Sequence, residues 1–402
     1  MRLFKLFRTD PKSGEKIKLS GEDFAAQNPY HASVAREYHI AQLVLFSLLA
    51  LFVILSMLIR SDDITYENFF YLFKDIHAAV DSENVTFTSL VYNADDAQDF
   101  DTYRGGLAVA GSSGLTVFSA TGRQTLSRQW NMNAPRLHTS SRYILVYDQG
   151  GTDFYLFNAF SRIYSGKVKG NLTCAAVSDA GWLAVASQNG SSSVISVYDK
   201  YNHLKAEHFK NAFATALALD QKGNLLAIVT TDTLQGHYLT KIELYAAGTD
   251  TLLREWSFEG LFPLKCAFAD NEILYLTGTD RMLILNTDGE ILSDLSFTQK
   301  ITKAHYSEQG YALNLSDGSL QIFDRNGELL GARDEGENIH SVLVGEDRIY
   351  MMSEGELMTY HRETGSSTSQ TFDFSVHELL WYSEDELLLC SRSIARFLNL
   401  KS

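Results

Sequence analysis

Cysteine, proline and tryptophan are scarce in this chain of 402 residues, which contains 3 Cys, 4 Pro and 4 Trp. So few cysteines exclude a disulfide-stapled scaffold, and so few prolines exclude a proline-rich stalk. Basic side chains are also outnumbered, with 34 Lys and Arg against 49 Asp and Glu, so the net charge is −15. Because DNA and RNA phosphates require a basic surface, we expect no nucleic-acid partner.

The sequence also lacks the short motifs that mark common enzyme classes. It has no P-loop, HExxH, CxxC or dinucleotide fingerprint, and the GSSG at 111–114 has the wrong spacing for a nucleophile elbow. Cys174, Cys266 and Cys390 lie in apolar stretches and are interpreted as core residues. The Asp-Gly pairs lack the oxygen ligands of a calcium loop and are interpreted as turns. We therefore expect no cofactor and no metal, and we assign no catalytic residue.

Charge is distributed unevenly along the chain. Residues 1–40 have a net charge of +2, residues 41–59 carry none, and residues 61–402 have a net charge of −18. Residues 40–59 form an apolar run of 20 residues, enough to cross a hydrocarbon core of about 30 Å as a helix. No small-residue cleavage pattern follows this run, so residues 40–60 are predicted to be an uncleaved transmembrane signal anchor.

The flanking basic residues predict the orientation of this span. Seven Lys and Arg precede it, so residues 1–39 are expected to be a cytoplasmic tail and the rest of the chain to lie outside. Residues 66–80 have helical spacing, and residues 61–83 are predicted to be a linker or helix that joins the anchor to a domain at 84–402. The predicted location is a cell membrane, crossed once. The alternative, suggested by four Asn-x-Ser/Thr sequons, is a lumenal domain in a eukaryotic secretory pathway.

From residue 84 onward the apolar period is that of strands, and one unit recurs. Each unit has a short first strand, an apolar second strand, a third strand and turns rich in Asn-Gly and Asp-Gly. The predicted first strands begin about 40 residues apart at Thr88, Arg136, Thr173, Thr215, Lys265, Lys303, His340 and Glu378. Four strands per unit of this length predict an all-β domain, a β-propeller.

We favour eight blades. The last unit ends at its third strand, so a segment near residues 83–93 is expected to supply a closing strand. If that segment only closes the ring and the first unit starts later, seven blades are the alternative. A tandem pair of β-sandwiches is the rival fold, because it also consists of many short strands.

The repeats over residues 84–400 are similar to WD40-like and quinoprotein-like propellers. The basic head, the single span, the ITYENFFYLFKDI segment at 64–76 and the acidic repeats together resemble a family of membrane-anchored propeller proteins of Gram-positive, clostridial-type bacteria. This resemblance implies a fold and a location and brings no assigned activity. The Trp-Asp dipeptide of WD40 blades and the regular tryptophans of quinone-cofactor propellers are both missing.

A polar ring is the predicted site. In a propeller the first strand of each blade lines the central channel, so the aligned strand starts are expected to form a ring that includes three cations. Such a ring in a low-dielectric funnel is suited to a carboxylate or phosphate ligand. The alternative is a wet channel mouth with no ligand. The predicted ligand-binding residues at this mouth are Arg136, Lys265, Lys303, His305, His340 and His377.

These features favour a membrane-anchored binding or scaffolding module, with protein or peptide partners in the envelope. Two alternatives remain open. One is an extracytoplasmic hydrolase or lyase that uses histidines and carboxylates at the channel mouth, and the other is a sensor of an envelope ligand.

Overall fold

The computed structural model describes residues 7–9, 16–18, 41–52 and 89–400, except 96, 160, 270–271, 308, 334–338, 354, 363 and 384–385. The chain divides into two compact units, Met1–Ile76 and His77–Ser402. In the first unit, β1 (Phe7–Thr9) pairs with β2 (Lys16–Lys18), and residues 41–52 form a helix.

The predicted membrane span overlaps this helix only in part. Within the ranges given above, none of the helices has both the length and the apolar character needed to cross a membrane. The remainder of the predicted span and the predicted linker at 61–83 lie outside the described residues.

The second unit is an eight-bladed β-propeller, which confirms the predicted repeat and the predicted blade number. Blade 1 contains β4 (Gln98–Tyr103), β5 (Gly106–Gly111), β6 (Gly114–Phe118) and β7 (Gln124–Gln129). Blade 2 contains β8 (Pro135–Thr139), β9 (Ile144–Asp148), β10 (Asp153–Phe157) and β11 (Arg162–Lys167). Blade 3 contains β12 (Asn171–Val177), β13 (Leu183–Asn189), β14 (Ser192–Tyr198) and β15 (Leu204–Lys210). Blade 4 contains β16 (Phe213–Leu219), β17 (Leu225–Leu234), β18 (His237–Ala246) and β19 (Leu252–Glu259).

The second half of the propeller repeats the same order. Blade 5 contains β20 (Pro263–Phe268), β21 (Ile273–Gly278), β22 (Arg281–Asn286) and β23 (Ile291–Ser296). Blade 6 contains β24 (Ile301–Ser307), β25 (Gly310–Leu315), β26 (Leu320–Asp324) and β27 (Leu329–Arg333). Blade 7 contains β28 (Ser341–Val344), β29 (Arg348–Ser353), β30 (Glu356–His361) and β31 (Ser367–Thr371). Blade 8 contains β32 (Glu378–Ser383), β33 (Glu386–Cys390), β34 (Ile394–Asn399) and, from the start of the domain, β3 (Ser89–Val91).

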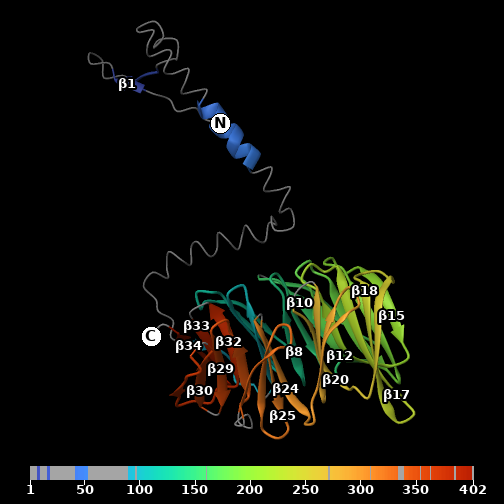
Figure 1. Ribbon diagram of the computed structural model, residues 1–402. Coiled ribbons are helices and arrows are strands. Elements are labelled where there is room, and N and C mark those ends of the chain that lie inside the picture. Colours follow the sequence, from blue (N-terminus) through green and yellow to red (C-terminus); the bar gives the residue numbers. More distant parts are fainter. Residues whose placement is uncertain are drawn as a thin grey trace. The chain divides into compact units, whose positions relative to one another are not determined.

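The closing strand corrects one prediction. β3 pairs antiparallel with β34, with Val91 opposite Ile394, so the segment after residue 88 closes the last blade rather than opening the first. The first strand of blade 1 is β4, about ten residues later than predicted. Figure 1 shows the red strands of blade 8 beside the blue-green strands of blade 1. Eight complete blades result because the closing strand and the first unit are separate.

Apolar clusters between neighbouring blades hold the ring together. The second strands are buried on both faces, as in β5 and β9, and therefore consist almost entirely of apolar residues. Between blades 4 and 5, for example, Val229 and Ile242 share one cluster with Leu276 and Leu283. Each such buried side chain stabilises the fold by about 2 kcal/mol. Outer strands such as β31 are exposed and polar.

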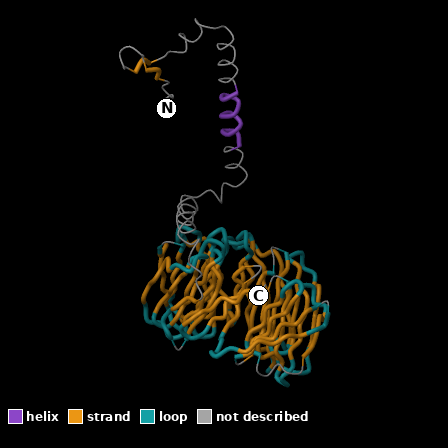
Figure 2. The backbone as a smooth tube through the Cα atoms, turned by 90° about the vertical axis from the view of Figure 1, so that its left-hand side faces the viewer, coloured by secondary structure: helices purple, strands orange, loops and turns teal. Residues whose placement is uncertain are grey.

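The antiparallel order of each blade defines two faces of the propeller. We call the face where the first strands begin the start face, and it also holds the turns between second and third strands. The end face holds the turns between first and second strands. Figure 2 shows the strands of this unit with loops at both of their ends. The start of a channel-lining strand and its end therefore belong to different mouths of the channel.

Candidate functional site

The first strands form the wall of the channel. First strands of consecutive blades contact one another at seven of the eight junctions, including that of β32 in the last blade with β4 in the first. Each is the edge strand of its sheet, so alternate backbone N–H groups have no ladder partner and need another acceptor. Side chains of the preceding blade supply that acceptor at several junctions.

Two carboxylates join blades 1 and 2 in this way. Asp99 Oδ2 accepts a hydrogen bond from the N–H of Leu137 at 2.9 Å. Asp101 Oδ2 accepts from the N–H of Thr139 at 3.1 Å and from its hydroxyl at 2.8 Å. Alternate side chains of a first strand therefore face the next blade.

The same junction recurs with other side chains. His138 Nδ1 accepts from the N–H of Val177 at 3.4 Å, which joins blades 2 and 3. Ser341 Oγ accepts from the N–H of Leu379 at 3.0 Å, which joins blades 7 and 8. In each case one polar side chain satisfies a backbone donor at the edge of the neighbouring sheet.

His305, one of the predicted ligand residues, is a further junction, between blades 6 and 7. Its Nδ1 accepts from the N–H of Val342 at 3.3 Å, so Nε2 holds the proton and donates to Asn314 Oδ1 at 3.0 Å. The side chain is 6 % exposed, and burial lowers its pKa to about 3. Both ring nitrogens are occupied by the protein, and the imidazole is neutral at physiological pH.

The three predicted cations all lie on first strands that line the channel. Arg136 Nε donates to Gln149 Oε1 at 2.8 Å, and Lys303 Nζ donates to the carbonyl oxygen of His340. Lys265 Nζ lies 4.6 Å from the centre of the Tyr306 ring. Within the described part of the chain, Lys265 makes no hydrogen bond and no ion pair.

Carboxylates also lie on the first strands, and the sequence prediction did not include two of these carboxylates. Because β4 rather than residue 88 opens blade 1, Asp99 and Asp101 occupy the wall there, and Glu378 follows in blade 8. Three cationic and three acidic side chains therefore line the channel. Burial raises the pKa of Asp99 and of Glu378, because each carboxylate is enclosed by protein. The charged ring is balanced rather than cationic.

The charges act on one another across the channel. Burial lowers the pKa of the Lys265 ammonium, and the negative charge of Glu378 is the largest influence opposing that shift, followed by that of Asp101. Lys265 is nevertheless open to solvent, as is His138 on β8. Both side chains thus project into a water-accessible lumen that protein encloses.

The other two predicted histidines lie beside the last blades. His340 Nε2 donates to the carbonyl oxygen of Val376, which fixes the ring between blades 7 and 8. His377 is exposed at the start of β32, and its backbone N–H donates to the carbonyl oxygen of Cys390 at 2.7 Å.

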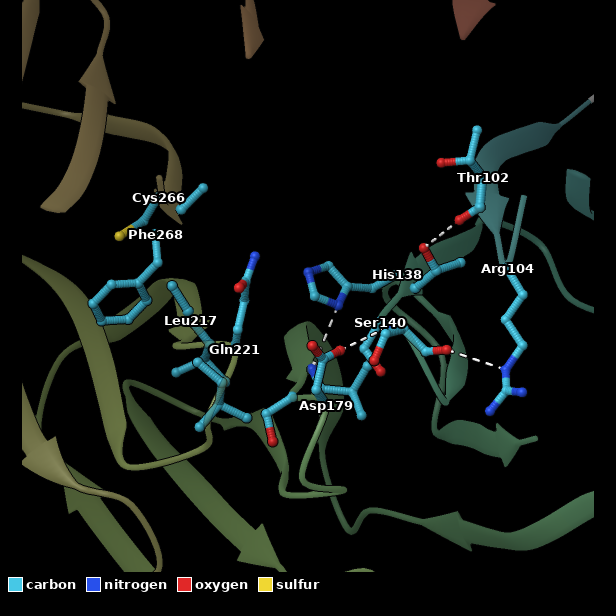
Figure 3. A pocket seen from close by; sticks show the side chains of 16 residues that line it. Thr102, Arg104, His138, Ser140, Asp179, Leu217, Gln221, Cys266 and Phe268 are labelled. Atoms are coloured by element: carbon cyan, nitrogen blue, oxygen red, sulfur yellow. Dashed lines mark hydrogen bonds between the residues drawn. The ribbon is translucent and has the colours of Figure 1, made fainter. Parts of the chain in front are cut away.

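A hollow of about 400 Å³ opens at the end face. Residues from the ends of the first strands of blades 1 to 5 line it, including Thr102, His138, Gln221, Cys266 and Phe268. In Figure 3 the side chains of Gln221 and His138 extend into the same space. None of the six charged side chains of the ring lines this hollow.

Hydrogen bonds link each turn around this hollow to the turn of the next blade. Arg104 Nε donates to the carbonyl oxygen of Ser141 at 3.1 Å, and the N–H of Ser141 donates to Asp179 Oδ1 at 2.6 Å. The N–H of Asp179 in turn donates to the carbonyl oxygen of Gln221 at 3.1 Å. These bonds connect the end-face turns of blades 1 to 4.

The three cysteines are buried and free, as the sequence predicts. In the portion of the chain that the structure describes, no three His, Cys, Asp or Glu side chains converge as metal ligands.

Residues 81–400 match a family of unknown function, DUF5711. The chain belongs to this family. No curated protein matches it.

Solved structures similar to this DUF5711 member are propellers. BamB from Moraxella catarrhalis is 12% identical with a TM-score of 0.57, covering 78% of this chain and 96% of that chain. Sqt1 from Saccharomyces cerevisiae is 9% identical with a TM-score of 0.59, covering 78% and 98%. Sqt1 from Chaetomium thermophilum, bound to the N-terminus of the ribosomal protein L10, is 13% identical with a TM-score of 0.53, covering 77% and 100%. At these identities the likeness shows the fold alone.

A second feature of this DUF5711 propeller, not predicted from the sequence, lies on the start face. We call it the rim patch: large apolar side chains, each 45–72 % exposed, at Phe209, Phe213, Leu234, Tyr238 and Leu264. They come from the strand ends of blades 3, 4 and 5 that meet at this face. In the sequence, the signal for this feature is the unusual length of the strand pair at 225–246, in which each strand has ten residues.

The rim patch has a rigid base. β17 and β18 pair along their whole length through a turn at Gln235 and Gly236, both with positive φ. β18 pairs with β19 only from Leu239 onward, where Leu239 lies opposite Glu259. The tip of the β17–β18 hairpin therefore projects past the four-stranded sheet. The Tyr238 ring lies 5.0 Å from that of Phe262, and Thr240 Oγ1 donates to the carbonyl oxygen of Leu261 at 2.7 Å.

Proposed function

We propose that this protein is a binding module that docks a partner protein on the rim patch. A β-propeller is suited to protein binding or scaffolding, and the exposed apolar surface at 209–264 is the observation that supports docking here. Large apolar side chains that gather on one face of a protein are a feature of interaction sites. Aromatic and aliphatic anchors at the centre of such a site contribute most of the binding energy.

The partner fitted to this surface presents apolar side chains of its own. The hairpin of blade 4 and the pinned loop at 260–262 supply a preformed shape, so little ordering is needed on binding. The hollow lies apart from this patch, because it opens at the other face, whereas Lys265 of the charged ring directly follows Leu264 of the patch.

A photo-crosslinking amino acid at Leu234 tests this function in cells that express the full chain. We expect discrete crosslinked partners that disappear when Phe213 and Tyr238 are both changed to Ser. The matched control places the same crosslinker at Leu329, which is 58 % exposed at the beginning of β27 and so belongs to the end face. Identical products at both positions, or no product at Leu234, contradict the proposal.

The proposed location is a membrane, with residues 40–59 as the anchor, the N-terminus in the cytoplasm and the propeller outside. The apolar run and the basic residues that precede it support this placement. Because the native cysteines are buried, introduced cysteines report the topology with little background. A membrane-impermeant maleimide is expected to label Asp250→Cys on intact cells and Lys12→Cys only after lysis. The reverse pattern, or equal labelling, contradicts the placement.

The geometry does not favour the hydrolase or lyase alternative. His305 has no free ring nitrogen, and the Nε2 proton of His340 is donated to a backbone carbonyl. Sensing stays compatible with a docking module, since a bound ligand or partner is the input that a sensor requires.

A further inference from the structure

The hollow at the end face has a hydrogen-bonding side and an apolar side. Thr102, His138 and Gln221 bring polar side chains to it from blades 1, 2 and 4. Leu217 and Phe268 bring apolar side chains from blades 4 and 5. Figure 3 shows Leu217 and Phe268 across the space from Thr102. A ligand that fills this hollow therefore has an apolar face and polar groups.

His138 presents an unused hydrogen-bond donor to the hollow. Its Nδ1 accepts from the N–H of Val177 at 3.4 Å, so the proton of the neutral ring is on Nε2. Enclosure by protein lowers the pKa of His138, and the charge of Lys265 acts in the same direction, so the ring is neutral at physiological pH. Among the residues that the structure describes, none accepts a hydrogen bond from Nε2.

Gln221 and Thr102 present further polar groups. The backbone carbonyl of Gln221 holds the end-face turn, and its exposed side-chain amide makes no hydrogen bond to any described residue. The carbonyl of Thr102 accepts from the Thr139 hydroxyl, whereas its own hydroxyl has no partner in the described part of the chain. Amide and hydroxyl groups both donate and accept. Donors and acceptors from three blades are thus distributed around one space.

The lining adds no net charge to this space. Its two ionised side chains, Arg104 and Asp179, have opposite signs, and both are bound to the backbone of Ser141, at 3.1 Å and 2.6 Å. A charged ligand would lose hydration here without meeting a matching counter-charge. The hollow therefore favours an uncharged ligand.

We propose that this hollow binds a neutral sugar of one or two rings. A sugar ring has hydroxyl groups around its edge, so one ligand reaches Thr102, His138 and Gln221 together and replaces the hydrogen bonds of the water that it displaces. Its C–H face packs against Leu217 and Phe268. A volume of about 400 Å³ lies at the lower end of the range for small-ligand sites. This site is independent of docking at the rim patch, which lies on the other face.

Titration of the full chain with neutral monosaccharides and disaccharides, followed by ligand-observed NMR in a buffer free of sugar-based detergents, tests the site. We expect at least one of these sugars to bind at millimolar concentration or below. The 6-phosphate and the uronic acid of that sugar are expected to bind at least tenfold more weakly, because the lining has no charge to match theirs. Uracil, an uncharged ring that offers amide groups and no hydroxyls, is expected to be weaker by the same factor.

Variants assign the sugar to the polar side of the hollow. His138→Asn keeps a side-chain oxygen for the N–H of Val177 and removes the Nε2 donor, and Gln221→Leu removes the amide. Each is expected to weaken sugar binding about tenfold, through the loss of a hydrogen bond made in an enclosed site. Gln370→Leu makes the same replacement on the exposed strand β31 of blade 7 and is the matched control, expected to bind like the unmodified protein.

Three results overturn the proposal. They are the absence of binding by every neutral sugar at millimolar concentration, binding of a charged sugar or of uracil as tight as that of the best neutral sugar, and unchanged affinity in both His138→Asn and Gln221→Leu. The first two use the unmodified protein, so they do not depend on whether the variants fold. Loss of crosslinking at Leu234 with intact sugar binding rejects rim docking alone, and the opposite result rejects this site alone.

Discussion

The buried histidine at the junction of blades 6 and 7 makes the stability of the propeller depend on pH. His305 has a pKa of about 3 in the folded protein, chiefly because of burial, and the Lys303 charge adds to this shift. In the unfolded chain a histidine has a pKa of about 6.5. Between these values the unfolded state binds a proton that the folded state does not, so stability falls as pH decreases.

The size of this effect follows from the two pKa values. Going from pH 7.5 to pH 5, His305 is expected to lower the free energy of unfolding by about 2 kcal/mol. Glutamine is the matched replacement, because its side-chain oxygen accepts from the N–H of Val342 and its amide donates to Asn314 without titrating. Urea unfolding of the unmodified protein and of His305→Gln at both pH values measures the difference. Other titrating groups are common to both proteins and cancel in the comparison.

The result is decisive in either direction. If the two proteins lose the same free energy between pH 7.5 and pH 5, within about 0.5 kcal/mol, then His305 does not stay neutral in the fold. The assignment of its Nδ1 as the acceptor at this junction is then wrong as well.

Three other predictions concern the closure, the junctions and the thiols. Leu90→Ala is expected to destabilise the fold by about 2–4 kcal/mol, because this side chain is buried between blades 8 and 1. Val91→Ala, at 68 % exposure on the same strand, is expected to cost less than about 0.5 kcal/mol, and equal urea midpoints for the two variants contradict the closure. Ser341→Ala leaves the N–H of Leu379 unsatisfied and is expected to cost about 1–2 kcal/mol in the same assay, and an unchanged midpoint speaks against this junction. Burial raises the pKa of Cys174 to about 12, so thiol reagents are expected to react at pH 8 only after unfolding, and rapid reaction of the native protein refutes this burial.

The blade repeat was predictable because each second strand is buried on both faces. Runs such as 144–147 and 311–313 are apolar throughout, and short turns with Asn-Gly or Asp-Gly follow at regular intervals. These signals are local, so seven of the eight first strands were located correctly to within a few residues. The same local signals reveal that the last blade is one strand short.

The boundary between the closing strand and the first strand of blade 1 could not be located from such signals. Residues 89–91 and 98–103 both read as short strands, and nothing near them shows that the first pairs with residue 394, about 300 positions away. Placing the first strand at residue 88 put a threonine in the channel wall where the structure has Asp99. Because this strand was misplaced, the sequence prediction missed the carboxylates of Asp99 and Asp101.

That displacement also changes the chemistry of the site. With a threonine in blade 1, the ring has three cations and one acid, and an anionic ligand follows. With Asp99 and Asp101 there, three acidic side chains balance the three cations, so a purely anionic ligand is no longer expected. The order of charges around the ring depends on which strand is the first strand of blade 1. The pairing of β3 with β34 shows that this strand is β4. In a closed ring of similar units, the register of one short strand therefore determines what the shared channel is able to recognise.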